Sequence, residues 1–316
     1  MKNSICVMII TILAAVVCFA GENRTNPVHA GQIRNEAELL DFYRQYSEFT
    51  DPGEYAYLYK NLPDSLEALC RIIQSQYTNP FVLAMTGGQI PKERENEMMK
   101  YPTVKLALEG LLSYDPSGLV QDRKPEDRLF LICRDNSILL ASILKSRGVP
   151  VRVRYGYAPY LIPGFHASHV ICEVWNADDH RWVLVDPSTN MIDFSRDQFD
   201  FSNDVWEEMQ EKKIDPNKYG IPGRYTGIIT MTMIVCGDLA SILGTEYATY
   251  QFPSILSYAI QNNNQLSPEY IEMLNSISEL MESIDAENLS KLQEIHDSTP
   301  DIQFTNTLNH AEKGGK

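Results

Sequence analysis

Residues 131–150, LICRDNSILLASILKSRGVP, read as a helix that has to be buried on several sides. Apolar side chains fall on nearly every side of it: Ile138, Leu139, Ala141, Ile143 and Leu144. Such a helix belongs inside a core and not on a surface. Gly148 suits the left-handed position after a helix end, and Pro150 prevents the helix from continuing. The sequence therefore predicts a buried helix that begins near Cys133.

Three segments with strand character follow this helix. They alternate apolar and polar residues or are rich in β-branched and aromatic side chains: VRVRYGYA (151–158), HVICEVW (169–175) and RWVLVDPS (181–188). The turn NADD (176–179) joins the last two segments into a predicted hairpin. We expect residues 158–168, between the first two strands, to form a loop that borders a cleft and gates it.

The predicted hairpin brings a histidine and an aspartate together. With a turn at 176–179, Glu173 faces Trp182 and His169 faces Asp186. Directly opposed residues on antiparallel strands have Cβ atoms about 4.5–5.5 Å apart. A hydrogen bond from one imidazole nitrogen to the carboxylate then fixes the tautomer and stabilises the imidazolium. The other nitrogen remains available as a base.

Cys133 has the local features of an activated nucleophile, because a helix N-terminus and a nearby imidazolium both favour the thiolate. Each residue alone also has an ordinary structural explanation, such as a core thiol, a strand histidine or an Asp-Pro strand end. Together they predict a catalytic set. In it Cys133 is the nucleophile, His169 is the base and Asp186 orients His169.

A metal site is the alternative for the pattern H-x-x-H-x-x-C at His166, His169 and Cys172. His169 and Cys172 are three residues apart, so in a strand their side chains point to opposite faces. They would not converge on one ion. We therefore expect neither a metal nor another cofactor.

The run from Cys133 to Pro187 resembles the transglutaminase-like superfamily. The matching pieces are CRDNSILLASILKSRGVPVRVRYGY, HVICEVW and RWVLVDPS, in the order of the family pattern. Cys133 stands fifteen residues before Gly148, as in that pattern. Glu173 and Trp182 also fall on its positions. Several pieces in order and at the right spacing are a more specific signal than any one short motif.

The resemblance implies an α+β fold, with the cysteine helix on an antiparallel sheet, and a papain-like triad of Cys133, His169 and Asp186. It implies a thiol enzyme that acts on amide or peptide bonds through a thioester, and we expect hydrolysis rather than cross-linking. A peptide or protein is the expected substrate. The alternative is an envelope binding or assembly module on the same fold, with a vestigial triad.

Four parts are expected along the chain: a signal peptide or anchor (1–20), a linker (21–33), a transglutaminase-like domain with a helical N-terminal part (34–200) and a helical C-terminal extension (201–316). The extension looks similar to that of bacterial members of the superfamily. In it we expect residues 222–245 to form a long, mostly apolar helical segment, and we expect two amphipathic helices that start at Ser267 and Asp285.

The first 20 residues, MKNSICVMIITILAAVVCFA, contain a lysine, a long apolar run and then small residues. This layout is typical of a secretory signal peptide that is cut after Ala20, and an uncleaved membrane anchor is the alternative. Lipid attachment at Cys18 is disfavoured because Val17 is a poor fit to the small residue expected there. We expect an exported protein, periplasmic or extracellular.

Charge and cysteine content restrict the partners and the cross-links. The net charge of −15 repels phosphate backbones, so nucleic-acid binding is disfavoured, and so is docking to an anionic membrane. Beyond the first 20 residues the cysteines are Cys70, Cys133, Cys172 and Cys236. If Cys133 stays free, at most one disulfide forms among the other three, and the sequence leaves that pairing open.

Overall fold

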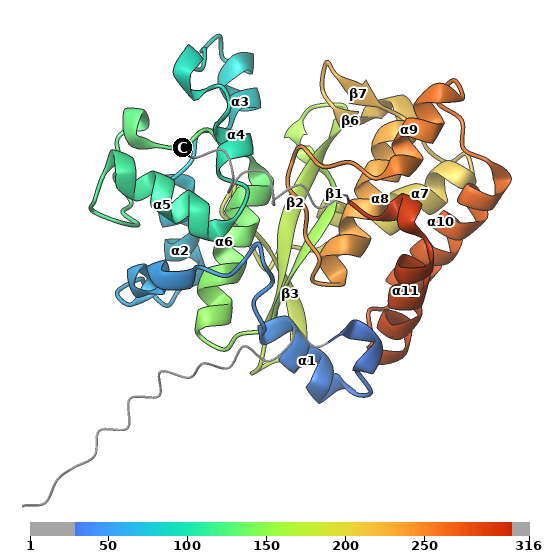
Figure 1. Cartoon of the computed structure of the whole chain (residues 1–316), viewed down its shortest axis with the longest axis horizontal. Coiled ribbons are helices and arrows are strands. Elements are labelled where there is room, and N and C mark those ends of the chain that lie inside the picture. Colours follow the sequence, from blue (N-terminus) through green and yellow to red (C-terminus); the bar gives the residue numbers. More distant parts are fainter. Residues whose placement is uncertain (1–28, 305–316) are drawn as a thin grey trace, which may run out of the picture.

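A mostly antiparallel sheet separates two groups of helices in the computed structural model (Figure 1), which describes residues 29–304. The strands are β1 (Val151–Ile162), β2 (Phe165–Asn176), β3 (Arg181–Asp186), β4 (Met191–Ile192), β5 (Asp200–Phe201), β6 (Tyr219–Ile221) and β7 (Tyr225–Thr226). Their order is β4-β3-β2-β1-β5, and β6 pairs in parallel with β2 and antiparallel with β7. The predicted signal peptide or anchor at 1–20 lies outside the described residues.

The two groups of helices cover opposite sides of β1 and β2 (Figure 1). The α-helices are α1 (Glu36–Arg44), α2 (Leu66–Gln74), α3 (Pro80–Met85), α4 (Glu97–Lys100), α5 (Val104–Tyr114), α6 (Cys133–Ser146), α7 (Ser202–Gln210), α8 (Ile228–Ile242), α9 (Ser254–Gln261), α10 (Pro268–Met281) and α11 (Ala286–Ser298). On one side α6 packs on β2 and β1, with α2 and α5 against it. On the other side α8 packs on β1, with α7 and α10 around it. The expected α+β fold class is confirmed.

The buried helix predicted from the sequence is α6, and both of its ends are as expected. It begins at Cys133, where the carboxylate of Asp135 accepts a hydrogen bond from the backbone N–H of Ile132 (2.9 Å). After its end, Gly148 has a φ of 73°. The backbone N–H groups of Gly148 and Val149 then turn back to carbonyls of the last helical turn. Local sequence is therefore sufficient to define this element.

The β2–β3 hairpin forms, but its register differs by two residues from the predicted one. The turn occupies residues 177–180 and not 176–179, so Trp175 faces Trp182. Asn176 stays in the strand because its side-chain oxygen accepts hydrogen bonds from two backbone N–H groups of the turn. The opposed tryptophan rings also contact each other edge to face, with centroids 5.4 Å apart. A shift of two residues leaves each side chain on its original face.

The predicted gating loop at 158–168 is wrong, because this segment continues the sheet. β1 runs on to Ile162 and β2 starts at Phe165, so only a tight turn separates them. The pairing shifts register between Ala158 and Ile162. This irregularity lies beside Pro159, whose missing N–H cannot contribute to a strand ladder. Pro159, a residue type that suggested a loop, therefore lies at a local irregularity within a continuous strand.

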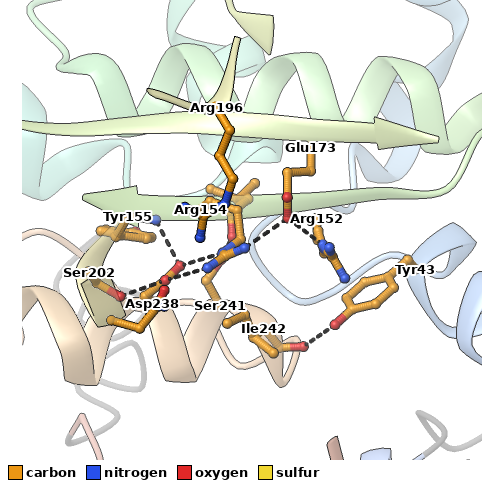
Figure 2. A network of polar contacts seen from close by, with 12 residues as sticks. Tyr43, Arg152, Arg154, Tyr155, Glu173, Arg196, Ser202, Asp238, Ser241 and Ile242 are labelled. Atoms are coloured by element: carbon orange, nitrogen blue, oxygen red, sulfur yellow. Dashed lines mark hydrogen bonds and ion pairs between the residues drawn. The ribbon is translucent and has the colours of Figure 1, made fainter. Parts of the chain in front are cut away.

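Polar residues of β1 and β2 form a buried ionic network between these strands and α8 (Figure 2). The guanidinium of Arg154 donates to both carboxylate oxygens of Asp238, with a donor–acceptor distance of 3.0 Å in each bond. It also donates to the carboxylate of Glu173, at a distance of 2.9 Å. Asp238 also accepts hydrogen bonds from the backbone N–H of Tyr155 (2.8 Å) and from the hydroxyl of Ser202 (2.7 Å). One carboxylate on α8 is thereby bonded to β1 and to the start of α7.

Arg152 completes this network at the other end. It donates to Glu173, and its guanidinium carbon lies 4.3 Å from the ring centroid of Trp182. Burial favours the neutral form of Glu173, but Arg152 and Arg154 outweigh it and lower the pKa of this carboxyl to about 2. Both arginines of β1 are thus salt-bridged inside the protein.

The two amphipathic helices near the C-terminus begin at their predicted caps. The side chains of Ser267 and Asp285 accept hydrogen bonds from the first turns of α10 and α11. The helical segment expected over 222–245 is shorter in the structure, because α8 starts only at Ile228 and the strand β7 occupies residues 225–226. Neither β7 nor β6 was predicted. Among residues 29–304, none of the helices combines the length and the apolarity needed to cross a membrane.

Candidate active site

His169 on β2 and Asp186 at the end of β3 form a buried hydrogen-bonded pair. The Nε2–H group of His169 donates to Oδ2 of Asp186 over 2.9 Å. The two side chains are 4% and 0% exposed. They meet obliquely and not directly opposite each other, because the strands are two residues away from the predicted register. The structure thus brings together the histidine and the aspartate that the sequence singled out.

Cys133 is the first residue of α6, partly buried, and interacts with His169. Burial disfavours the charged form of His169, but the carboxylate of Asp186, with a smaller effect of the neighbouring Cys133, outweighs it and raises the pKa of His169 to about 10. At neutral pH His169 is therefore an imidazolium, with a carboxylate and a cysteine as its neighbours.

The helix of Cys133 is attached to the strand of His169 by two further hydrogen bonds. Ser137, one turn after Cys133, donates from its hydroxyl to the backbone carbonyl of Val170 (2.9 Å). The thiol of Cys172 donates to the backbone carbonyl of Ser137 (3.3 Å). Both bonds are buried, so the helix start and the histidine are held in one position relative to each other.

Asp186 accepts hydrogen bonds from several groups besides His169. Its Oδ2 also accepts from the hydroxyls of Tyr160 (2.9 Å) and Thr189 (2.7 Å), and its Oδ1 accepts from the backbone N–H of Ser188 (2.8 Å). Burial favours the neutral carboxyl, but the charge of His169 and these hydrogen bonds lower the pKa of Asp186 below its ordinary value. The carboxylate is thus kept ionised and oriented.

Tyr160 and Thr189 were not predicted as parts of the site. The run Asp-Pro-Ser-Thr carries a local signal for Thr189, because Asp side chains often bond to residues two or three positions later. No local signal exists for Tyr160, which reaches Asp186 from another strand. The Cys133 helix also contacts this run, since the amide of Asn136 donates to the hydroxyl of Ser188 (3.0 Å).

Residues 100–187 match the family model of the transglutaminase-like superfamily. This segment is a transglutaminase-like core. The match includes Cys133, His169 and Asp186, and it starts in the helical part before α5. The resemblance expected from the sequence motifs is therefore confirmed. A comparison with curated proteins found no match, and neither did a comparison with solved structures.

The residues of the alternative metal pattern each have a different partner. His166 bonds through Nδ1 to Asp200, His169 bonds to Asp186, and the thiol of Cys172 bonds to a backbone carbonyl. Over the part of the chain that the structure describes, no three or more His, Cys, Asp or Glu side chains are grouped so as to hold a metal ion.

All four cysteines of the described chain are free thiols. Cys133 is partly buried, whereas the other three are buried. Burial raises the pKa of Cys70 and Cys236 to about 12, and it raises the pKa of Cys172 still further above the ordinary value. A buried thiol with a raised pKa is inert, since the thiolate is the reactive form. The three other cysteines therefore serve as internal references for the reactivity of Cys133.

Two surface cavities lie away from the candidate triad. They have volumes of about 700 and 430 Å³ and share the residues Arg181 and Trp182, near the turn of the β2–β3 hairpin. None of Cys133, His169 and Asp186 lines either cavity. The candidate active site is thus identified by its chemical groups. Cavity volume alone would indicate the surface around Arg181 and Trp182 instead.

Proposed function

We propose that this chain is a thiol enzyme that acts on amide or peptide bonds. The observation that carries the proposal is the buried His169–Asp186 hydrogen bond, with the helix that begins at Cys133 bonded through Ser137 to the residue after His169. A cysteine in this setting is favoured as the thiolate, which is the nucleophilic form. The position of all three residues inside the transglutaminase-like core supports the same conclusion.

The proposed reaction has two steps. The sulfur of Cys133 attacks the carbonyl carbon of the amide, and the backbone N–H of Cys133 is the oxyanion donor that the helix start offers. The imidazolium of His169 gives its proton to the leaving amine as the C–N bond breaks, which leaves a thioester. Neutral His169 then takes a proton from water as the water attacks the thioester. The acid product leaves, and the sulfur and the imidazolium are restored.

We propose hydrolysis ahead of cross-linking, with a peptide or protein as the substrate. Water needs no binding site of its own, whereas cross-linking requires that a second, amine-bearing substrate be bound beside the thioester. Export to the periplasm or the cell exterior is also proposed. Its support is the charge and apolarity pattern of residues 1–20, whether that segment is removed or remains as an anchor.

The first test measures the rate at which iodoacetamide alkylates Cys133 as a function of pH, with the site followed by mass spectrometry. We expect reaction near pH 6, well below the ordinary cysteine pKa of about 8.5. His169→Ala should abolish this low-pH reaction. His166→Ala is the matched control, because His166 lies on the same strand and pairs with Asp200 instead. Cys70, Cys172 and Cys236 should remain unmodified throughout.

A Cys133 that reacts only at alkaline pH, or that is indifferent to His169→Ala, contradicts the proposal and favours the binding or assembly module. If the thiol is activated, the next test is a peptide library incubated with and without hydroxylamine. Hydroxylamine intercepts a thioester and releases an acyl hydroxamate, which mass spectrometry detects. Cleavage in water alone supports hydrolysis, and products that form only with an added amine support cross-linking.

A further inference from the structure

Tyr160 lies where β1 leaves its regular register and reaches across to the end of β3. Its hydroxyl donates to Oδ2 of Asp186 over 2.9 Å, and this is the oxygen that also accepts from His169. The tyrosine ring stands edge-on to the His169 ring, with centroids 6.2 Å apart and an angle of 88° between the planes. Tyr160 therefore contacts both members of the buried pair.

Oδ2 of Asp186 receives three side-chain donors, from Tyr160, Thr189 and His169. A carboxylate has about four acceptor positions over its two oxygens, so three donors on one oxygen have to share its lone pairs. A donor to the ionised form also makes a carboxylate less basic. The hydroxyl of Tyr160 thus makes Asp186 a weaker acceptor and lessens its stabilisation of the His169 imidazolium.

The hydroxyl itself stays protonated and available as a donor. Burial and the nearby Asp186 raise the pKa of Tyr160 far above the ordinary tyrosine value, and the charge of Cys133 acts in the same direction. One side chain is thereby in contact with both His169 and Asp186.

We propose that Tyr160 is a positioning residue, whose hydroxyl orients the Asp186 oxygen that holds His169 and limits how strongly that oxygen stabilises the imidazolium. The inference rests on the proposed thiol chemistry, in which His169 gives the proton of its other ring nitrogen, Nδ1, to the leaving amine, while the Nε2 proton stays in the hydrogen bond to Asp186. A histidine held too firmly as the imidazolium is a poor donor and a poor base. The hydroxyls of Tyr160 and Thr189 share the Asp186 oxygen with His169, so that His169 can both give up and take up a proton.

The test uses Tyr160→Phe in the full chain, since this substitution removes the hydroxyl and retains the ring. Tyr157→Phe is the matched control, because Tyr157 is on the same strand, is buried, and makes no hydrogen bond through its hydroxyl within residues 29–304. NMR of histidine-labelled protein gives the titration midpoint of His169. It also gives the resonance of the proton between His169 and Asp186. Cys133 alkylation against pH is measured on the same samples.

We expect Tyr160→Phe to raise the His169 midpoint by about half a pH unit or more and to move the bridging proton downfield. Thr189→Val should act in the same direction, and Tyr157→Phe should change neither reading. An unchanged midpoint and resonance in Tyr160→Phe overturn the inference, as does an equal shift in Tyr157→Phe. If His169 shifts as expected while Cys133 of the unsubstituted protein is unreactive below pH 7, the positioning role is supported and the thiol function fails.

Discussion

The hydroxyl of Ser137 donates a hydrogen bond of 2.9 Å to the backbone carbonyl of Val170, which is the residue directly after His169. Ser137 lies one helical turn beyond Cys133. This contact spans two elements that the sequence defines separately, and it places the nucleophile beside the base. The distance between Cys133 and His169 therefore depends on a side chain that takes no part in the chemistry.

Ser137→Ala should lower both the stability of the protein and the reactivity of Cys133. Loss of a buried hydrogen bond costs about 1–3 kcal/mol of unfolding free energy, measured by urea denaturation. Ser142→Ala is the control, because Ser142 is on the same helix and shares a buried hydrogen bond of 2.8 Å with Tyr59. It should cost a similar free energy and leave low-pH alkylation of Cys133 unchanged. Equal reactivity in the two variants contradicts this role of Ser137.

Asp186→Asn should lower the pKa of His169 from its raised value of about 10. The reason is that burial disfavours the imidazolium and the carboxylate that most strongly opposes this effect is gone. NMR titration of the His169 ring measures the change, and alkylation of Cys133 near pH 6 should fall with it. Asp200→Asn, which changes the partner of His166 instead, should leave both readings as they are.

The stability that the His169–Asp186 pair contributes should have a maximum at mildly acidic pH. The folded-state pKa of His169 is raised from 6.5 to about 10, so its contribution is complete below pH 6.5 and is lost as pH rises toward 10. The pKa of Asp186 is lowered from 3.8, so its contribution is present above that value and is lost as pH falls.

Urea denaturation of the unsubstituted protein and of His169→Gln, at a series of pH values from 4 to 10, tests this dependence. The difference in unfolding free energy between the two should be greatest between about pH 4 and 6.5 and should shrink at higher pH. A difference that stays constant between pH 6.5 and 10 would mean that His169 is not charged in the folded protein.

Asp238→Asn should destabilise the protein strongly, because it leaves the buried guanidinium of Arg154 without its bidentate partner (Figure 2). Removal of one member of a buried ion pair costs about 3–5 kcal/mol, which urea denaturation measures. Asp193→Asn is the comparison, since Asp193 pairs with Arg181 at the surface, where such a pair contributes about 0–1 kcal/mol. Similar losses in the two variants would contradict the structural importance of the network.

Local sequence determined where three of the helices of this protein begin and the family motifs of its core. Apolar residues, Gly148 and Pro150 were sufficient for the bounds of α6, and cap residues were sufficient for α10 and α11. These features depend on neighbours within one or two turns of the chain. The motifs from Cys133 to Pro187 likewise predicted the transglutaminase-like core, because their order and spacing are properties of the sequence.

Tertiary structure alone decided the register of β2 on β3 and the extended course of residues 158–168. It also decided that Tyr160 bonds to Asp186 and that Arg154 is neutralised by Asp238, 84 residues further along the chain. Period-two patterns specify which face a side chain occupies but leave open a shift of two residues, which changes the partner and preserves the face. Contacts between distant segments have no local signature, since they arise only when helices and strands pack together.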